Sequence, residues 1–135
     1  MKKRILLVDD EAGITRMMRR NLEATGRFEV TDINNPALAL ETARQFRPDL
    51  VLLDVMMPGM DGGTVAAALA DDPQLGRVPV IFLTAIVSKK EVEPTGSMIG
   101  NHTFLAKPVK LEDLLACIDE QLGKALLCRQ KRRFP

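Results

Sequence analysis

The sequence predicts an α/β fold in which a doubly wound, five-stranded parallel sheet lies between two layers of helices. Three observations predict it: short apolar runs recur along the chain, helical patterns separate them, and 135 residues suit a single domain. Strands that alternate with helices run parallel and are joined by right-handed crossovers. The expected architecture is therefore a (βα)5 three-layer sandwich.

Five strands are expected, three in the interior of the sheet and two at its edges. Residues 5–8, 50–53 and 80–83 are unbroken apolar runs, as in strands that are buried on both faces. Residues 28–31 alternate and residues 103–106 are less apolar, so these two strands are expected at the edges. The strand order 2-1-3-4-5 satisfies this requirement, and in that order ligands bind beyond the carboxyl ends of the first and third strands.

Helical periodicity fills most of the intervals between these strands. The first helix has apolar residues at positions 14, 18 and 22, and the second begins with Asn35 as its cap and Pro36 in its first turn. A third helix is expected from about Asp61. Pro94 and Gly96 should keep any element in residues 88–96 short or distorted. The last helix has the most regular apolar stripe: Leu111, Leu114, Leu115, Ile118, Leu122 and Leu126.

The charge balance does not favour a dedicated nucleic-acid-binding protein. Nineteen basic and eighteen acidic side chains give a net charge of +1. Four of the basic residues lie in residues 129–133, so the remainder of the chain is mildly acidic. We interpret residues 128–135 as a basic tail or the start of a linker, and a solvated tail is favoured over contact with nucleic acid or lipid.

Several classes of protein are disfavoured by what the sequence contains. His102 is the only histidine, which argues against multi-histidine zinc sites and a Ser-His-Asp triad. Cys117 and Cys128 form no disulfide framework, so a reducing compartment is expected. Only residues 5–8 are apolar after the basic N-terminus, too few for a signal peptide, and no run is long enough to span a membrane. The expectation is a cytoplasmic protein without a membrane partner.

Polar and charged residues follow the interior strands at the point where each strand ends. Asp9 and Asp10 follow the first strand, Asp54 the third, Thr84 the fourth and Lys107 the fifth. Because the carboxyl ends of parallel strands lie at one edge of the sheet, we expect these side chains to converge.

Three carboxylates with a single ammonium group require a proton or a metal ion among them. Oxygen ligands favour a hard divalent cation, and Mg²⁺ suits a site with few protein ligands. A carboxylate beside such a cation and a lysine can accept a phosphoryl group. Asp54 is the natural nucleophile because it stands alone at its strand end, whereas Asp9 and Asp10 form a pair suited to holding metal.

Each of these residues also has an ordinary interpretation. The run Asp9-Asp10-Glu11 by itself is about as consistent with capping the first helix as with binding metal. Lys107 by itself would be a surface lysine in most proteins, and Phe104 would be edge-strand core. The joint pattern favours the functional interpretation, since the ordinary one requires several independent coincidences at one sheet edge.

The chain resembles the receiver domain of two-component response regulators, the CheY-like family, over essentially residues 3–127. Four motifs carry the resemblance, and they occur in the expected order and spacing: ILLVDDE at 5–11, LDVMMPGMDG at 53–62, LTA at 83–85 and FLAKP at 104–108. The resemblance implies a receiver domain over residues 1–127. It also implies that Asp54 accepts a phosphoryl group from a histidine kinase or a histidine phosphotransfer protein.

The same resemblance assigns further roles. Asp10, Asp54 and the backbone carbonyl of Met56 would bind Mg²⁺ directly, and Asp9 would act mainly through a water. Lys107 would pair with Asp54 and then with the phosphoryl oxygens. Thr84 and Phe104 would form the conformational switch, and the peptide bond between Lys107 and Pro108 would be cis.

The implied function is a signalling switch that catalyses only its own phosphorylation and dephosphorylation. An effector or output domain would bind the face formed by the last helix, the fifth parallel strand and the segment before it. Two alternatives remain open: a receiver-like interaction domain that works without phosphorylation, and a Mg²⁺-dependent aspartyl phosphatase. The phosphatase is disfavoured because such enzymes place an Asp-x-Asp motif after the first strand, whereas Asp9 and Asp10 are adjacent.

Overall fold

The computed structural model describes most of the chain, and the site described below lies within that part. The described residues are 2–55, 57, 59, 61–84, 97–99, 102–107 and 109–133, without the side chains of 97–99, 102 and 124–133. The predicted short or distorted element at residues 88–96 lies outside the described residues.

The sheet contains the five parallel strands that were expected, in the expected order. They are β1 (Lys3–Val8), β2 (Phe28–Ile33), β3 (Leu50–Asp54), β4 (Val80–Thr84) and β6 (His102–Ala106). β1 pairs with β2 and β3, β3 with β4, and β4 with β6, all in parallel. The order 2-1-3-4-5 of the parallel strands is therefore confirmed.

A sixth strand lies beyond β6 and corrects one detail of the prediction. β5 (Ser97–Ile99) pairs with β6 in an antiparallel manner and forms the edge of the sheet, in the order β2-β1-β3-β4-β6-β5. β6 is therefore an interior strand rather than an edge strand. Its less apolar sequence is tolerated there because β5 is only three residues long.

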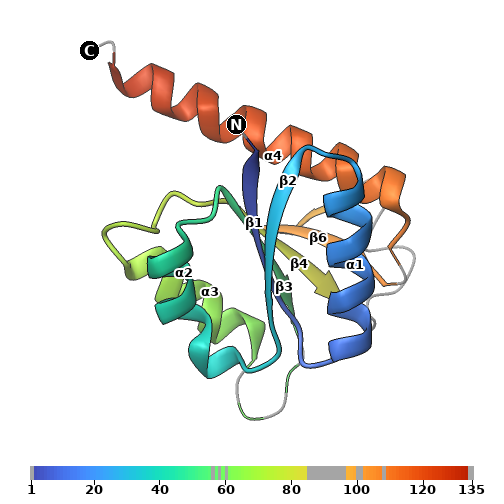
Figure 1. Cartoon of the computed structure of the whole chain (residues 1–135). Coiled ribbons are helices and arrows are strands. Elements are labelled where there is room, and N and C mark those ends of the chain that lie inside the picture. The colour runs from blue at the N-terminus through green and yellow to red at the C-terminus, as the bar shows by residue number, and fades with distance from the viewer. Residues whose placement is uncertain are drawn as a thin grey trace.

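In the described part of the chain, helices cover both faces of the sheet (Figure 1). α1 (Ala12–Ala24) and α4 (Leu111–Arg133) pack on one face through Met18, Leu22, Leu114 and Ile118. α2 (Ala39–Phe46) and α3 (Gly62–Asp71) pack on the other face, where the core includes Ala43, Val65 and Leu69. The alternate residues of the interior strands divide between these two cores, as expected for strands that are buried on both sides.

Side chains cap two helices at their N-termini, and one of these caps, Asn35, was predicted. Asn35 caps a short 3₁₀ helix, η1 (Pro36–Leu38), which leads directly into α2, and its side chain accepts a hydrogen bond from Ala37 N. Asp61 caps α3 by accepting from Thr64 N at 2.7 Å, and this hydrogen bond lowers the pKa of Asp61. Both caps satisfy amide groups that have no partner within the helix.

α4 continues well past the body of the domain, as Figure 1 shows. Its backbone is helical through Arg133, and the division of the chain at residue 127 stays a prediction. In the described part of the chain, no helix combines the length and the apolar character needed to cross a bilayer.

Asp72 links α2 to the end of α3 and should make the stability of the fold depend on pH. The Asp72 carboxylate is 6% exposed, accepts from Arg44 Nε at 2.6 Å and from Gln74 N at 2.8 Å, and its pKa is lowered, chiefly by the Arg44 hydrogen bond. A folded-state pKa below the ordinary 3.8 contributes stability above that pH, which is lost as the pH falls through the folded value.

We therefore expect Asp72→Asn to lower the free energy of unfolding at pH 7, and the deficit to shrink below about pH 4. Urea unfolding at several pH values measures this difference. Asp71→Asn, an exposed neighbour, is the matched control and should show no comparable deficit. A deficit for Asp72→Asn that stays constant down to pH 3 would contradict the assignment to the ionised pair.

Candidate functional site

The carboxyl ends of four parallel strands bring the predicted site residues to one edge of the sheet. Asp9 follows β1, β3 ends at Asp54, β4 ends at Thr84, and Lys107 follows β6. The ladder continues just past the strands, since Lys107 N donates to Thr84 O at 2.8 Å and Val55 N donates to Leu83 O at 3.0 Å. The backbone that carries these side chains is therefore part of the rigid sheet.

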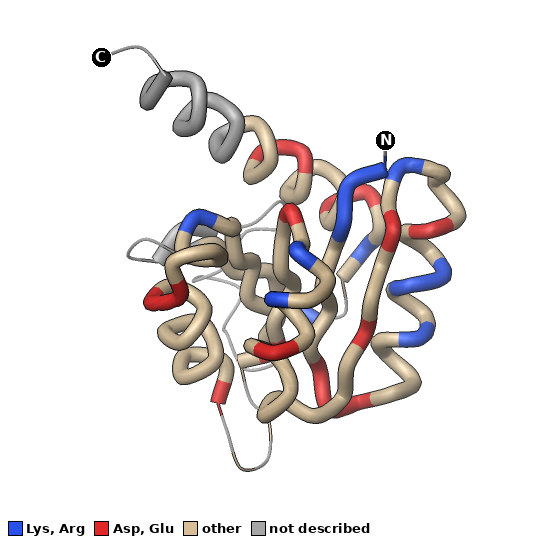
Figure 2. The backbone as a smooth tube through the Cα atoms, turned by 60° about the vertical axis from the view of Figure 1, so that its left-hand side comes forward, with Lys and Arg blue, Asp and Glu red and all other residues tan. Residues whose placement is uncertain are grey.

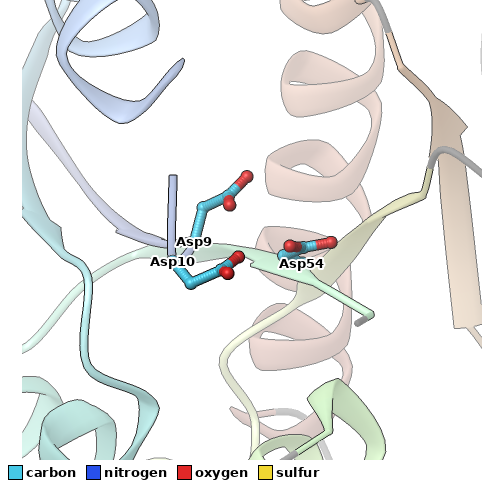
Figure 3. A group of neighbouring side chains, drawn as sticks. All are labelled: Asp9, Asp10 and Asp54. Carbon is cyan, nitrogen blue, oxygen red and sulfur yellow. The ribbon is translucent and has the colours of Figure 1, made fainter. Parts of the chain in front are cut away.

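Three carboxylates form the centre of the site (Figure 3). Asp9, Asp10 and Asp54 each offer an oxygen that lies within 4.8 Å of the other two. Asp9 is fully buried and Asp54 is 5% exposed, whereas Asp10 is more exposed than either. Acidic residues gather in this region at the end of β1, while basic residues follow one another along α1 (Figure 2).

Lys107 supplies the positive charge at the centre of this cluster. Its Nζ lies 2.6 Å from Asp9 Oδ2 and 3.5 Å from Asp54 Oδ1, and its side chain is 13% exposed. The ammonium is closer to Asp9 because that carboxylate has no contact with solvent and depends most on a charged partner. The resemblance had suggested Asp54 as the main partner of Lys107, and the structure places the lysine between both acids.

The pKa of Lys107 is set by two opposing influences. Burial acts to lower it, but the hydrogen bond that the ammonium donates to Asp9 and the charges of Asp9 and Asp54 outweigh burial, so the pKa lies above its ordinary 10.5. A raised pKa means that the ammonium stabilises the fold below pH 10.5, and that this contribution is lost as the pH rises through the folded value. Lys107 is therefore charged throughout the neutral range.

Both oxygens of the Asp9 carboxylate accept hydrogen bonds. Its Oδ1 accepts a hydrogen bond from Glu11 N at 3.0 Å, just ahead of the helix, while its Oδ2 accepts from Lys107. The amide of Glu11 precedes the helix, and no side chain caps α1 by a hydrogen bond, so the structure does not support the capping interpretation of the acidic run. The two hydrogen bonds to its carboxylate fix the orientation of Asp9.

Gly62 allows α3 to begin directly against the strand that carries Asp54. A Cβ atom at position 62 would lie 2.4 Å from Asp54 O and 2.9 Å from Val55 Cα, and Gly62 N donates to Val55 O at 2.8 Å. Only glycine permits this approach of two backbones. The functional part of the motif at residues 53–62 thus includes a packing requirement that the acids alone do not reveal.

The remaining predicted residues are placed as follows. Thr84 is 4% exposed at the end of β4. Phe104 is partly buried on β6, and its ring stacks on Phe82 at 5.1 Å between centroids. The predicted carbonyl ligand of Met56 and the predicted cis bond to Pro108 lie outside the described residues. The proposed roles of all these residues stay predictions.

The chemistry of the donors fits a magnesium ion. All three clustered acids offer oxygen, the donor that hard divalent cations prefer, and one ammonium leaves the cluster with excess negative charge. No other group of three or more acid, histidine or cysteine ligands occurs among the residues that the structure describes. Asp10, whose carboxylate is the most exposed of the three, is the natural point of access.

Asn34 belongs to the site region, but sequence reasoning missed it. It follows β2, and its side-chain amide donates to the backbone carbonyl of Asp9 at 2.8 Å. The rule that identified the other residues, a polar side chain directly after a strand, would have pointed to Asp32, because the expected second strand ended at residue 31 whereas β2 continues to Ile33.

Comparisons with known proteins identify the family of this chain. The response regulator receiver domain family matches residues 5–119. The response regulator PleD of Caulobacter vibrioides is 40% identical over 109 residues, which are 81% of this chain and 24% of PleD. MtrA of Mycobacterium tuberculosis, a DNA-binding response regulator, is 38% identical over 92% of this chain and 52% of its own length. DivK of Brucella anthropi, a polar-differentiation response regulator, is 33% identical over 93% of this chain and 100% of its own length.

Solved structures agree with this assignment. The chemotaxis protein CheY4 of Vibrio cholerae matches with a TM-score of 0.75 at 28% identity, covering 89% of this chain and 98% of CheY4. The receiver domain of the sensor histidine kinase PA1611 from Pseudomonas aeruginosa matches with a TM-score of 0.74 at 28% identity, covering 91% of this chain and 99% of that domain. In the PA1611 domain a magnesium ion is coordinated in the active-site cleft.

These relatives differ in length, and the chain corresponds to different shares of them. It spans about a quarter of PleD, about half of MtrA and the whole of DivK. What these relatives share with this chain is the receiver domain. The chain belongs to the receiver domain family of two-component response regulators, which are phosphorylation-dependent signalling switches.

Proposed function

We propose that Asp54 accepts a phosphoryl group from the phosphohistidine of a histidine kinase or a histidine phosphotransfer protein. The observation that carries this proposal is the convergence of Asp54 with Asp9, Asp10 and Lys107 at one edge of the sheet. Of the three acids, Asp54 is the one held in the middle of the sheet, on β3 between β1 and β4. Its neighbours can therefore surround an incoming phosphoryl group without moving the strand.

The transfer itself needs little covalent chemistry from the protein. An oxygen of Asp54 forms a bond to phosphorus while the bond from phosphorus to the donor's imidazole nitrogen breaks, and the electron pair stays on that nitrogen. The Lys107 ammonium, 3.5 Å from Asp54 Oδ1, can stabilise the charge that develops on the phosphoryl oxygens.

Asp10, Asp54 and the backbone carbonyl of Met56 would hold Mg²⁺, with Asp9 acting mainly through a water. When bound, the ion supplies positive charge beside the phosphoryl oxygens. The protein's own part is to keep Asp9 and Lys107 paired and to orient Asp10 toward Asp54. Asp9 is suited to this supporting role because both of its oxygens already accept hydrogen bonds, from Glu11 and from Lys107.

Phosphorylation would then bias a surface that has two alternative arrangements. The added negative charge draws the hydroxyl of Thr84 toward Asp54, and Phe104 on the neighbouring strand can fill the space that this leaves. Phe104 is suited to such a change because it is only partly buried and rests on Phe82 rather than within the core. An effector or an output domain would bind the face that includes β6 and α4, and the chain would work in the cytoplasm.

We infer that the chain catalyses only its own phosphorylation and dephosphorylation. The test is to incubate the purified chain with acetyl phosphate and Mg²⁺ and to measure the intact mass. We expect a gain of one phosphoryl group, which is absent when EDTA removes the divalent cation. Steady turnover of a generic phosphate ester would instead favour a phosphatase.

Two outcomes would contradict the proposal. One is the absence of any mass gain from acetyl phosphate and from a phosphorylated histidine kinase alike. The other is a gain that EDTA leaves unchanged. Tight binding of a partner that is insensitive to phosphorylation, together with either outcome, would support an interaction domain that works without the phosphoryl group.

A further inference from the structure

Asn34 is bonded to the peptide unit that joins the two adjacent acids of the site. Its Nδ2 donates to Asp9 O at 2.8 Å and to Thr15 Oγ1 at 3.0 Å. We propose that Asn34 is a positioning residue that orients Asp10 for Mg²⁺ by fixing the peptide bond between Asp9 and Asp10. This inference rests on the proposed function, because it takes Asp10 to be a ligand of the ion.

Asp10 depends on its backbone for its orientation. No hydrogen bond or ion pair joins its carboxylate to another residue in the described part of the chain, although it lies within 4.8 Å of Asp9 and Asp54. The peptide unit is planar, so the direction of the Asp9 carbonyl determines where the amide and Cα of Asp10 lie. Whatever holds that carbonyl therefore aims the side chain of Asp10.

The other polar atoms of Asp9 are already held by different parts of the chain. Asp9 N donates to Ile33 O at 3.2 Å, Oδ1 accepts from Glu11 N, and Oδ2 accepts from Lys107 Nζ. The Glu11 contact closes a turn across Asp10, and the contact at the Asp9 carbonyl adds a direct restraint on the peptide unit that joins the two acids. The Asn34 amide provides that contact from the neighbouring strand end.

Asn34 is itself held in place by the first turn of α1. Thr15 is fully buried, and its hydroxyl donates to Ala12 O at 3.1 Å, so a lone pair of Oγ1 faces the amide of Asn34. The amide therefore bridges the end of β1 and the beginning of α1, the two segments that flank Asp10. Because the Asn34 side chain bonds to both ends of this turn, it restricts the backbone of the turn more than either hydrogen bond would alone.

The neighbouring Asn35 provides a matched control. It is the same residue type in the same loop, but its side chain accepts a hydrogen bond from Ala37 N and caps η1. Truncation at position 35 removes a helix cap, whereas truncation at position 34 removes the carbonyl contact. Asn34 is exposed overall, so its truncation leaves no core cavity.

The experiment is a calorimetric titration of Mg²⁺ into wild type, Asn34→Ala and Asn35→Ala, followed by acetyl phosphate uptake at several Mg²⁺ concentrations. We expect Asn34→Ala to bind Mg²⁺ about tenfold more weakly, as is typical when a group that orients a ligand is removed. Its uptake rate should return to the wild-type value at saturating Mg²⁺. Asn35→Ala should bind Mg²⁺ like wild type even though it is the variant that loses a helix cap.

A second variant keeps the test independent of the truncation. Thr15→Val removes the hydroxyl that anchors Asn34 while preserving the shape of the side chain, and it should weaken Mg²⁺ binding less than Asn34→Ala. Wild-type Mg²⁺ affinity in Asn34→Ala, or an equal loss in Asn35→Ala, would overturn the inference. Absence of Mg²⁺ binding by the wild-type chain would instead contradict the proposed function, so the two failures are distinguishable.

Discussion

Asp54→Asn is expected to take up no phosphoryl group from acetyl phosphate while remaining folded. The amide has nearly the same shape as the carboxylate, but its nitrogen and neutral oxygen cannot attack phosphorus as the carboxylate does. Neutralising one of three clustered acids also removes repulsion from Asp9 and Asp10, which outweighs the lost attraction to Lys107 at 3.5 Å. We therefore expect the free energy of unfolding to rise by about 1 kcal/mol, as measured by urea denaturation at low ionic strength.

The control for this variant is a second buried aspartate outside the site. Asp72, at the end of α3, is 6% exposed and pairs with Arg44, and Asp72→Asn should be phosphorylated to the same extent as wild type. Intact mass after incubation with acetyl phosphate and Mg²⁺ separates the two variants. Uptake by Asp54→Asn equal to that of wild type would place the acceptor elsewhere, with the more exposed Asp10 as the first residue to test.

The sequence predicts the sheet well because its interior strands have an unambiguous pattern. Residues 5–8 and 50–53 are all apolar and all essentially inaccessible to solvent. A continuous apolar run of this kind is needed only in a strand that is covered on both faces. Once these strands are parallel and in the right order, the positions of Asp9, Asp54 and Lys107 follow from geometry alone. The convergence of the site was therefore predictable before any distance was known.

β5 was not predictable in the same way. Three residues, 97–99, are too few to show either the alternation of an exposed strand or the continuous apolar run of a buried one. The only local signal is the Gly-Asn pair at 100–101, a pair typical of two-residue connections between antiparallel strands. When this pair is not considered, the sequence of residues 103–106 resembles an edge strand, although β5 pairs with β6.

Individual hydrogen bonds and close backbone contacts also could not be predicted from the sequence. The pattern places Lys107 among three acids, but the preference for Asp9 depends on which carboxylate is most completely buried. The need for glycine at position 62 depends on how closely α3 approaches the backbone of Asp54. Both are consequences of packing within a few ångströms, which periodicity and residue type do not encode.

Lys107→Met is expected to separate magnesium binding from phosphoryl uptake. Loss of the ammonium removes a positive charge that would stabilise the phosphoryl oxygens, and we expect uptake to slow by at least about a hundredfold. The same change removes a positive charge beside the acids, so Mg²⁺ should bind more tightly than to wild type. Timed assays at saturating Mg²⁺ measure the rate of phosphoryl uptake, and calorimetry measures the Mg²⁺ affinity of the same protein.

The variant should also be less stable, and Mg²⁺ should partly restore it. Removing one partner of a buried ion pair leaves the fully buried Asp9 carboxylate without its cation, which costs about 3 kcal/mol. A cation that binds only the folded state offsets this loss as its concentration rises above its dissociation constant. Lys110→Met, an exposed lysine three residues further on, is the matched control and should change none of these quantities. If Lys107→Met bound Mg²⁺ more weakly than wild type, the lysine would be supporting the geometry of the acids rather than opposing the ion by its charge.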